Sequence, residues 1–346
     1  MRCLTLAEEL RQNGAVVFFI CRELPGHLCS HLEDKHFSVL RLYTYDVRES
    51  HASWLGVSWQ QDAEEVSQIL RQEFLKKKRR IDWLVVDHYA LDRRWEEKMR
   101  PFVDKIMVID DLADRSHDCD LLLDQNLYEN MESRYDGLVP ENCRKLLGPQ
   151  YALLRPEFIK ARANLRKRDG TVKCILVFLG GADPTNETAK ALEAIQLLER
   201  PDIAVDVVVG LSNPHREQIK EICSTMPNTS YHCQVDNVAE LMAQADLAIG
   251  AGGIATWERC CLGLPSITMI TAENQERITS AVALHQAILN LGNNKNVGSE
   301  DIFEALNILL TEKNMLLAMT NAALSIISGI EAKENIITGI ILGKII

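Results

Sequence analysis

The chain has 346 residues, of which 47% are hydrophobic and 25% charged, and its formal net charge at pH 7 is −11. These values are ordinary for a globular enzyme of two domains, and the negative charge argues against a nucleic-acid-binding protein, which would present a basic face. The ten cysteines include no C-x-x-C pair, and no apolar run reaches the roughly 18 residues of a membrane span. We therefore expect a cytoplasmic protein that needs no membrane, metal or cofactor.

Strand-like and helix-like segments alternate along the chain, which is typical of α/β layers with parallel strands. Residues 1–10 predict a helix that ends at Asn13 and Gly14. A doubly wound domain normally opens with a strand, so we expect the strand that belongs before this helix to precede Met1. The strands predicted in the first half are 16–21, 39–42, 83–86, 105–109 and 121–123, with helices at 63–75 and 93–103.

The second half repeats the pattern. Its predicted strands are 174–179, 204–209, 229–232, 247–249 and 266–269, and its predicted helices are 187–198, 214–224, 238–245, 254–262 and 275–291. A charged segment at 151–170 separates the halves. We expect an N-terminal domain at 1–150 and a C-terminal domain at 171–346, both Rossmann-like and doubly wound, facing each other across a cleft with ligands at the carboxyl ends of the strands.

Two glycine-rich turns follow predicted strands in the second half. Gly250, Gly252 and Gly253 lead into a helix that carries Glu258. Glycine lets a backbone approach a ligand closely, and the N–H groups at a helix start attract phosphate. The Glu258 carboxylate could accept hydrogen bonds from a ribose diol. This turn therefore predicts a nucleotide site.

The other turn contains Gly180 and Gly181 and runs to Asn186 before the next helix. Two such turns in one domain suit a diphosphate. Neither is a G-x-G-x-x-G fingerprint or a P-loop, so a dinucleotide cofactor is weakly supported. The alternative is that each turn only joins a strand to a helix.

Polar residues follow two further strands. Asn274 and Gln275 suit hydrogen bonds to sugar hydroxyl or acetamido groups, or Asn274 caps a helix. In the first half, Asp87, His88 and Tyr89 directly follow a strand, where α/β folds place working residues. Asp87 could orient His88, or His88 is a loop histidine bonded to backbone.

Acidic residues downstream of this segment raise the possibility of a metal. Asp110, Asp111, His117, Asp118 and Asp120 include carboxylates of the kind that bind Mg²⁺. We favour a turn over a metal site here, because short acidic side chains commonly hydrogen-bond the backbone of turns.

Five motifs occur in order along the chain: residues 1–7, 87–89, 148–155, 180–186 and 252–258. Together they resemble the UDP-2,4-diacetamido-2,4,6-trideoxy-β-L-altropyranose hydrolases of pseudaminic acid biosynthesis. That family is similar to the MurG-type glycosyltransferases and has a glycosyltransferase-B fold. The resemblance spans nearly the whole chain and is least distinctive from about residue 293 on.

The resemblance implies that water attacks the anomeric carbon and releases UDP with inversion and without a metal. Asn186 and Glu258 would hold the UDP-sugar, with Glu258 on the ribose, while Asn274 and Gln275 would lie near the sugar. Gly180, Gly181, Gly252 and Gly253 would meet the diphosphate, Tyr89 would face the reacting centre, and His88 would be auxiliary.

The chain departs from the family at the general base. In the family this base is a histidine in a G-x-G-H turn just before the helix that corresponds to residues 1–10, so we expect it upstream of Met1. His27 and His31 do not match that position. We accordingly expect residues 1–346, as a monomer, to bind UDP but to hydrolyse substrate poorly or not at all. The alternatives are a UDP-sugar glycosyltransferase and a non-catalytic nucleotide-sugar-binding remnant.

Overall fold

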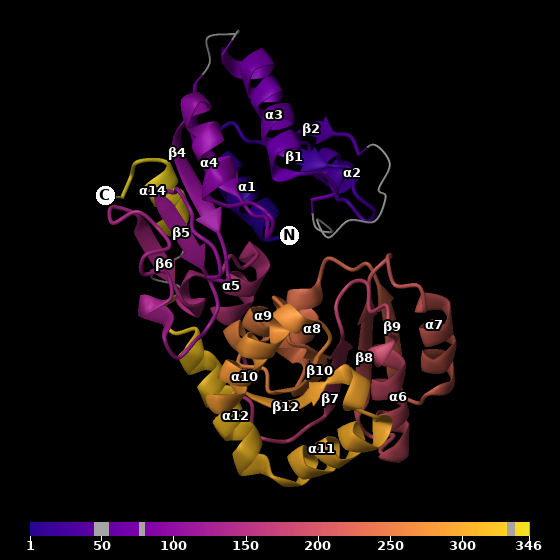
Figure 1. Cartoon of the computed structure of the whole chain (residues 1–346). Helices are drawn as coiled ribbons and strands as arrows, with labels where there is room; N and C mark the ends of the chain where they lie inside the picture. Colours follow the sequence, from indigo (N-terminus) through magenta and orange to yellow (C-terminus); the bar gives the residue numbers. More distant parts are fainter. Residues whose placement is uncertain (45–54, 76–79, 331–335, 346) are drawn as a thin grey trace. The chain divides into compact units, whose positions relative to one another are not determined.

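The computed structural model describes residues 1–44, 55–75, 80–330 and 336–345. The chain folds into two compact units (Figure 1). Unit 1 contains Met1–Asn126, Asn130–Leu153 and the C-terminal helix α14 (Ile336–Ile341). Unit 2 contains Leu127–Glu129 and the chain from Leu154 through helix α12 (Lys313–Ile326).

Unit 1 contains two parallel sheets. In the first, β1 (Phe18–Arg22) pairs with β2 (Ser38–Leu42). In the second, the strands lie in chain order and every neighbouring pair is parallel. These strands are β3 (Ile81–Val86), β4 (Val103–Ile109), β5 (Leu121–Asp124) and β6 (Arg144–Leu147). The helices of the unit are α1 (Arg2–Gln12), α2 (Cys29–Asp34), α3 (Trp59–Leu70), α4 (Arg93–Met99) and α14.

The central strands of unit 1 are covered on both faces. On β4, Ile106 and Val108 belong to one apolar cluster, while Met107 and Ile109 belong to another that includes Leu6 of α1. Alternate residues of a strand point to opposite faces, and a continuous apolar run is what a strand with two covered faces requires. The strands predicted at 105–109 and 121–123 are confirmed as β4 and β5, and their continuous apolar runs reflect burial on both faces.

Helix α1 contacts both sheets of unit 1. Leu6 and Leu10 pack into the cluster that contains the β4 side chains, whereas Leu4 and Ala7 pack with apolar residues of β1 and β2. The helix predicted at 1–10 is confirmed, and its last turn ends at Asn13 as expected.

Unit 2 is built on one six-stranded sheet with the order β12-β11-β10-β7-β8-β9, and all neighbouring strands are parallel. The chain proceeds outward from β7 to β9 on one side and then outward from β10 to β12 on the other. The direction of winding therefore reverses between β7 and β10, as in a doubly wound Rossmann-type sheet. The strands are β7 (Cys174–Phe178), β8 (Ala204–Val209), β9 (Thr229–Cys233), β10 (Leu247–Ala251), β11 (Ser266–Ile270) and β12 (Ile288–Asn293).

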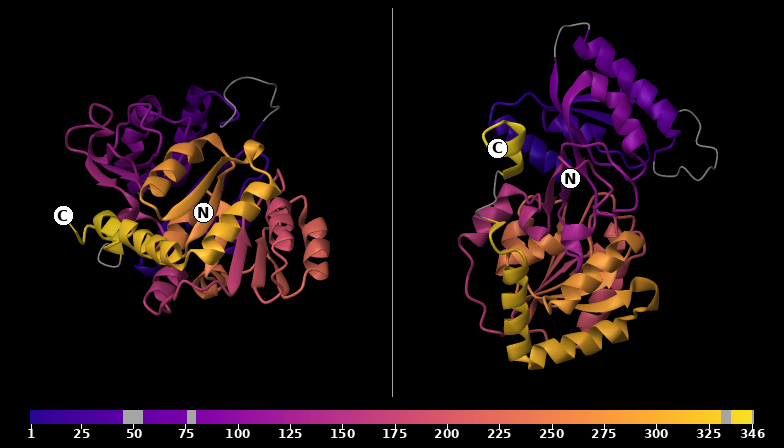
Figure 2. Two further views of the ribbon diagram at one scale, coloured as in Figure 1. Left: turned by 90° about the horizontal axis from the view of Figure 1, so that it is seen from below. Right: turned by 60° about the vertical axis from the view of Figure 1, so that its left-hand side comes forward.

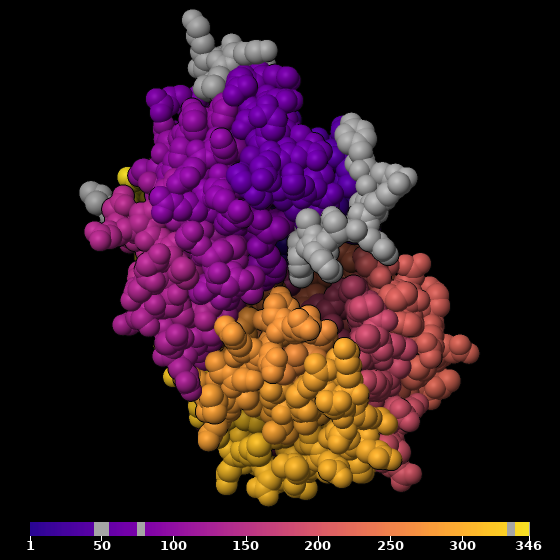
Figure 3. Space-filling model, in the orientation of Figure 1, coloured from indigo at the N-terminus to yellow at the C-terminus, as the bar shows by residue number. Residues whose placement is uncertain are grey.

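Helices cover both faces of this sheet (Figure 2). Ile175 and Val177 of β7 face an apolar cluster shared with α6, α7 and α11, whereas α8 and α9 contact β7 and β10 and, in turn, α5. Orange and yellow atoms, which belong to the C-terminal part of unit 2, form much of the surface that this unit presents in Figure 3. The helices are α5 (Pro156–Arg162), α6 (Glu187–Leu197), α7 (Arg216–Thr225), α8 (Val238–Gln244), α9 (Ala255–Cys261), α10 (Glu276–Leu284), α11 (Ser299–Thr311) and α12.

The helix predicted at 275–291 is wrong in its second half. Helix α10 ends at Leu284, Gln286 adopts a positive φ of 59°, and residues 288–293 form the edge strand β12. Leu284, Ile288 and Leu291 have helical spacing, which misled the prediction. Pairing of Leu289 with Ile267 of β11 supplies the backbone partner that a sequence pattern does not reveal.

Two further expectations need correction. The first-half helix predicted at 93–103 ends at Met99, because Pro101 lies in a short 3₁₀ turn and Val103 already begins β4. The C-terminal helix α14 belongs to unit 1, where Ile337 joins the cluster around β4, although the expected second domain extended to 346. No helix within the described ranges is long and apolar enough to cross a bilayer.

Candidate functional site

Both glycine turns leave the sheet of unit 2 at the point where its winding reverses. We call residues 180–186 the first glycine loop and residues 250–253 the second glycine loop. Phe178, at the end of β7, pairs with Gly250 in β10, so the two loops start side by side. In doubly wound sheets, ligands bind in the crevice outside the carboxyl ends of the strands at this reversal. The topology therefore places both loops where a ligand is expected.

The first glycine loop is shaped by residues in left-handed conformations. Gly180 has a φ of +93°, and a Cβ built on Gly181 meets no heavy atom within 4 Å. Asp183 and Asn186 also have positive φ values, of 36° and 60°. Gly210, which follows β8, contacts the Gly181 backbone so closely that a Cβ on it would overlap the Gly181 carbonyl oxygen. The backbones of Gly210 and Gly181 pack directly against each other, and this contact fixes the position of the loop.

The side chain of Asp183 lies at the start of α6. Its carboxylate accepts hydrogen bonds from the N–H groups of Glu187 at 2.9 Å and Thr188 at 3.0 Å, and from the Thr188 hydroxyl at 2.6 Å. Two of the first N–H groups of α6 are thus already paired with a protein carboxylate. The sequence-based expectation that this helix start attracts phosphate applies less well here than it does at the second loop.

Asn186 stands at the N-cap position of α6 in the left-handed conformation. Its side-chain N–H donates to Gln218 Oε1 at 3.3 Å, while its side-chain oxygen is buried without a hydrogen-bond partner among the described residues. A hydrogen-bond donor that reaches such a buried, unpaired oxygen stabilises the complex that it forms. Asn186 therefore presents an acceptor beside the first glycine loop.

The second glycine loop has almost no room for side chains. A Cβ on Gly250 would lie 2.6 Å from Nη1 of Arg259, and one on Gly252 would overlap the Thr279 hydroxyl. A Cβ on Gly253 would lie 3.6 Å from Nε2 of Gln275, so this glutamine stands next to the loop. Glycine is required at 250 and 252 because neighbouring side chains occupy the space that a Cβ would take.

Glu258 lies on α9, one turn after the second loop, and its side chain is mostly buried. Burial raises the pKa of this carboxyl above its ordinary value, while the Arg155 guanidinium opposes that rise. The Nη2 group of Arg155 donates to Oε1 of Glu258 at 3.0 Å. Arg155 belongs to the motif at 148–155, but the sequence indicates no role for it, since nothing local connects residues 103 positions apart.

Gln275 and Asn274 follow β11 in a 3₁₀ turn, η5 (Glu273–Gln275). The Gln275 side-chain oxygen accepts from the N–H of Thr271 at 3.0 Å and from its hydroxyl at 3.2 Å. The N-cap positions of the turn and of α10 are Ala272 and Gln275, so the helix-cap interpretation of Asn274 is wrong. Asn274 is exposed.

Asp87, His88 and Tyr89 follow β3 in unit 1. Arg2 pairs with the Asp87 carboxylate at 3.0 Å from Nε and 2.7 Å from Nη2. Burial opposes ionisation of Asp87, but the hydrogen bonds and charge of Arg2 hold its pKa below the ordinary value. His88 Nδ1 accepts the Ala90 N–H at 3.1 Å, so the structure gives His88 the backbone bond that the alternative interpretation expected. Tyr89 is half-buried.

The acidic residues considered for a metal have protein partners. Arg100 pairs with Asp118 at 2.7 Å and with Asp120 at 2.6 Å, and His117 Nδ1 lies 2.6 Å from Glu96 Oε1. Asp110 accepts from the Ala113 N–H and from the Tyr135 hydroxyl. The described part of the chain contains no group of three or more histidine, cysteine, aspartate or glutamate side chains that could hold a metal ion.

Solved structures with the same arrangement identify the architecture. The structure of Acinetobacter baumannii MurG superposes with a TM-score of 0.59 at 13% identity and covers 96% of this chain and 95% of that one. The glycotransferase of kitacinnamycin gives a TM-score of 0.59 at 18% identity, covering 96% and 93%. The chain has the glycosyltransferase-B fold. This fold comprises two Rossmann-like domains with parallel sheets, and at these identities the likeness concerns the fold alone.

Sequence comparisons agree with the glycosyltransferase-B fold, and for unit 2 they also match a domain family. Residues 174–336 match the model of the glycosyltransferase family 28 C-terminal domain. The spore coat polysaccharide biosynthesis protein SpsG of Bacillus subtilis is 28% identical over 256 residues, which cover 73% of this chain and 74% of that protein. The UDP-2,4-diacetamido-2,4,6-trideoxy-β-L-altropyranose hydrolase of Campylobacter jejuni is 28% identical over 212 residues, covering 60% and 73%. Most of unit 2 therefore matches the C-terminal domain of glycosyltransferase family 28.

Proposed function

We propose that the protein binds a UDP-linked sugar at the carboxyl edge of the sheet in unit 2. The observation that carries this proposal is the start of both glycine loops on the adjacent strands β7 and β10, where the winding reverses. N–H groups of Gly180, Gly181, Gly252 and Gly253 would meet the diphosphate. Glu258 would accept hydrogen bonds from the ribose. Asn186 would also hold the UDP-sugar, and Asn274 and Gln275 would lie near the sugar.

The proposed reaction is hydrolysis of the bond between the sugar and UDP. Water attacks the anomeric carbon, UDP leaves from the opposite face, and the configuration inverts. Negative charge that develops on the departing diphosphate would be stabilised by the N–H groups of the loops. The resemblance implies that no metal takes part, and it implies a diacetamido-trideoxy-altrose substrate in pseudaminic acid biosynthesis. The relative from Campylobacter jejuni, named as such a hydrolase, supports this choice.

Residues of unit 1 would take part in the reaction at the sugar, and the enzyme would act as a monomer in the cytoplasm. Tyr89 would face the reacting centre, with His88 auxiliary. An inverting reaction needs a base that activates the water.

A UDP-sugar glycosyltransferase is the second candidate, and the match of residues 174–336 to a glycosyltransferase domain favours it. The two reactions differ in the acceptor of the sugar, which is water in one case and a hydroxyl compound in the other. A non-catalytic nucleotide-sugar-binding protein is the third candidate and would bind UDP without turnover.

The test is UDP release from the diacetamido-altrose nucleotide in buffer without any acceptor, together with calorimetric binding of UDP. Release in water alone, with proton NMR showing the inverted anomer first, supports the hydrolase. Release that requires an added sugar or lipid acceptor supports the transferase. UDP binding with no release under either condition supports the binding protein. No UDP binding would overturn the site itself.

A further inference from the structure

Arg259 lies directly beneath the second glycine loop. It is the residue after Glu258 on α9, and only 2% of its surface is exposed. Its Nη2 donates to the carbonyl oxygen of Ala251 at 2.9 Å and to the Thr256 hydroxyl at 3.1 Å, while Nε donates to the Ser266 hydroxyl at 3.1 Å. The guanidinium fills the space that a side chain at Gly250 would need. It thus supports the backbone of the loop from within the unit.

Among the residues that the structure describes, the positive charge of Arg259 has no counter-ion in direct contact. Within the described residues no carboxylate forms an ion pair with it, and its Nη1 is buried without a hydrogen-bond partner. Glu258, the adjacent carboxylate, is paired with Arg155. Burial lowers the pKa of Arg259 to about 10, so the guanidinium is still protonated at pH 7. A buried charge without a partner is costly, which raises the question of what balances it.

We propose that Arg259 is a positioning residue whose charge is balanced by the diphosphate of the bound nucleotide. The inference rests on the proposed function, because it takes the second glycine loop as the diphosphate site. Glycine at 250 leaves only backbone atoms of the loop next to the guanidinium. Charges interact strongly across a layer of backbone, since water is excluded from it. By binding the Ala251 carbonyl, Arg259 also keeps that negative dipole away from the ligand.

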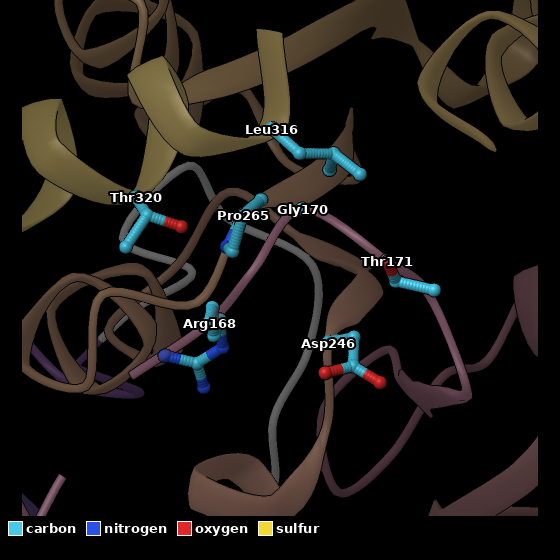
Figure 4. A pocket seen from close by; sticks show the side chains of 7 residues that line it. All are labelled: Arg168, Gly170, Thr171, Asp246, Pro265, Leu316 and Thr320. Atoms are coloured by element: carbon cyan, nitrogen blue, oxygen red, sulfur yellow. The ribbon is translucent and has the colours of Figure 1, made fainter. Parts of the chain in front are cut away.

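Arg168 is a matched control for Arg259. It too is buried, burial lowers its pKa to about 10, and it donates to carbonyl oxygens, among them Ala245 at 3.1 Å and Leu262 at 2.7 Å. These carbonyls follow the ends of α8 and α9. Arg168 lines a small cavity with Asp246 and Pro265 (Figure 4). Asp246 and Pro265 precede β10 and β11, so Arg168 lies at the amino edge of the sheet, away from the glycine loops.

The test measures the affinity of the whole chain for UDP, UMP and uridine by calorimetry, in wild type, R259M, R259Q and R259K and in the control R168M. Loss of the charge in R259M or R259Q is expected to weaken UDP binding about tenfold, because a buried unit charge attracts the diphosphate with little screening. Uridine carries no diphosphate, so its binding should change less than about twofold. R259K keeps the charge and should retain most of the UDP preference. Thermal unfolding of each variant reports its stability.

The ratio of UDP affinity to uridine affinity separates the outcomes. A purely structural role for Arg259 would lower both affinities together, as R168M should if it perturbs the fold, and an unchanged ratio in R259M or R259Q would overturn the inference. R259Q, which keeps polar atoms, provides the measurement should R259M not fold. Failure of the wild type to bind UDP would overturn the proposed function and this inference together. Wild-type binding with an unchanged ratio in the variants would overturn this inference alone.

Discussion

Arg155 donates two hydrogen bonds to the same carboxylate oxygen of Glu258, from Nε at 3.3 Å and from Nη2 at 3.0 Å. Arg155 is itself held in place, because it pairs with Glu157 at 3.1 Å and its guanidinium carbon lies 4.9 Å from the centre of the Phe158 ring. The orientation of Glu258 is therefore fixed by protein contacts. A carboxylate that is already oriented loses little conformational freedom when it binds a diol.

Replacing Glu258 by glutamine should weaken UDP binding about tenfold to a hundredfold. The proposed bonds from the ribose hydroxyls would then lose a charged acceptor, and hydrogen bonds to charged groups contribute about 1.5–3 kcal/mol. The measurement is calorimetric affinity for UDP and for 2′-deoxy-UDP. In the wild type UDP should bind more tightly than its deoxy analogue, and the E258Q variant should lose most of that preference.

Glu157 offers a matched control for this variant. It pairs with the same arginine, but 40% of its side chain is exposed and it lies outside the two glycine loops. E157Q should leave both affinities within about twofold, as is usual for exposed ion pairs. Equal losses of UDP affinity in E157Q and E258Q would mean that Glu258 acts only by holding Arg155, and the ribose role would be wrong.

A second prediction concerns pH and the buried carboxyl of Asp124 at the end of β5. Burial raises its pKa to about 7, although the Asn126 N–H, Arg134 and the Tyr135 hydroxyl favour the charged form. The folded protein thus holds a proton that the unfolded chain releases near pH 4. The contribution of Asp124 to the free energy of unfolding is therefore highest below pH 4. It declines as the pH rises to about 7 and then stays constant.

The Asp124→Asn variant isolates this effect, because an amide does not titrate. Between pH 5 and 8 the free energy of unfolding of the wild type should fall relative to D124N by about 2–3 kcal/mol, at 1.36 kcal/mol per pH unit below the folded pKa. Urea denaturation at several pH values measures the difference. D136N is the control, since 67% of the Asp136 side chain is exposed and it should track the wild type. A constant difference between D124N and wild type would show that Asp124 ionises normally.

Much of the scaffold could be predicted because its signals are local. An apolar run of strand length followed by glycines and a helix, as at Leu247 to Ala255, specifies its own geometry. The strands predicted at 174–179 and 247–249 are therefore confirmed as β7 and β10, which end at Phe178 and Ala251. That these two strands are neighbours depends on the order of the sheet, which no local pattern encodes.

The remaining features depend on contacts between distant residues. The sequence places Asp87 beside His88, but the structure pairs its carboxylate with Arg2, 85 residues away. Arg259 resembles any charged residue on a helix until the tertiary structure shows that Gly250 makes room for it.

A third prediction tests the contact between Gly210 and Gly181. The backbone of Gly210 approaches Gly181 so closely that a Cβ would overlap its carbonyl oxygen, and both partners are backbone atoms that cannot rotate away. Gly210→Ala should therefore displace the first glycine loop and destabilise the protein by about 1–3 kcal/mol, as overpacking usually does. UDP affinity should fall together with stability. Thermal unfolding and calorimetry on the same sample measure the two effects.

Gly181→Ala separates ligand contact from folding. A Cβ at this position meets no heavy atom within 4 Å, and Gly181 is not among the glycines with positive φ. G181A should unfold at the same temperature as the wild type, yet its added methyl group would occupy the space in which the proposed diphosphate approaches the backbone. We expect at least tenfold weaker UDP binding at unchanged stability. If G181A instead binds UDP like the wild type while G210A does not, the first glycine loop supports the fold but does not contact the diphosphate, and the second loop alone would form the proposed site.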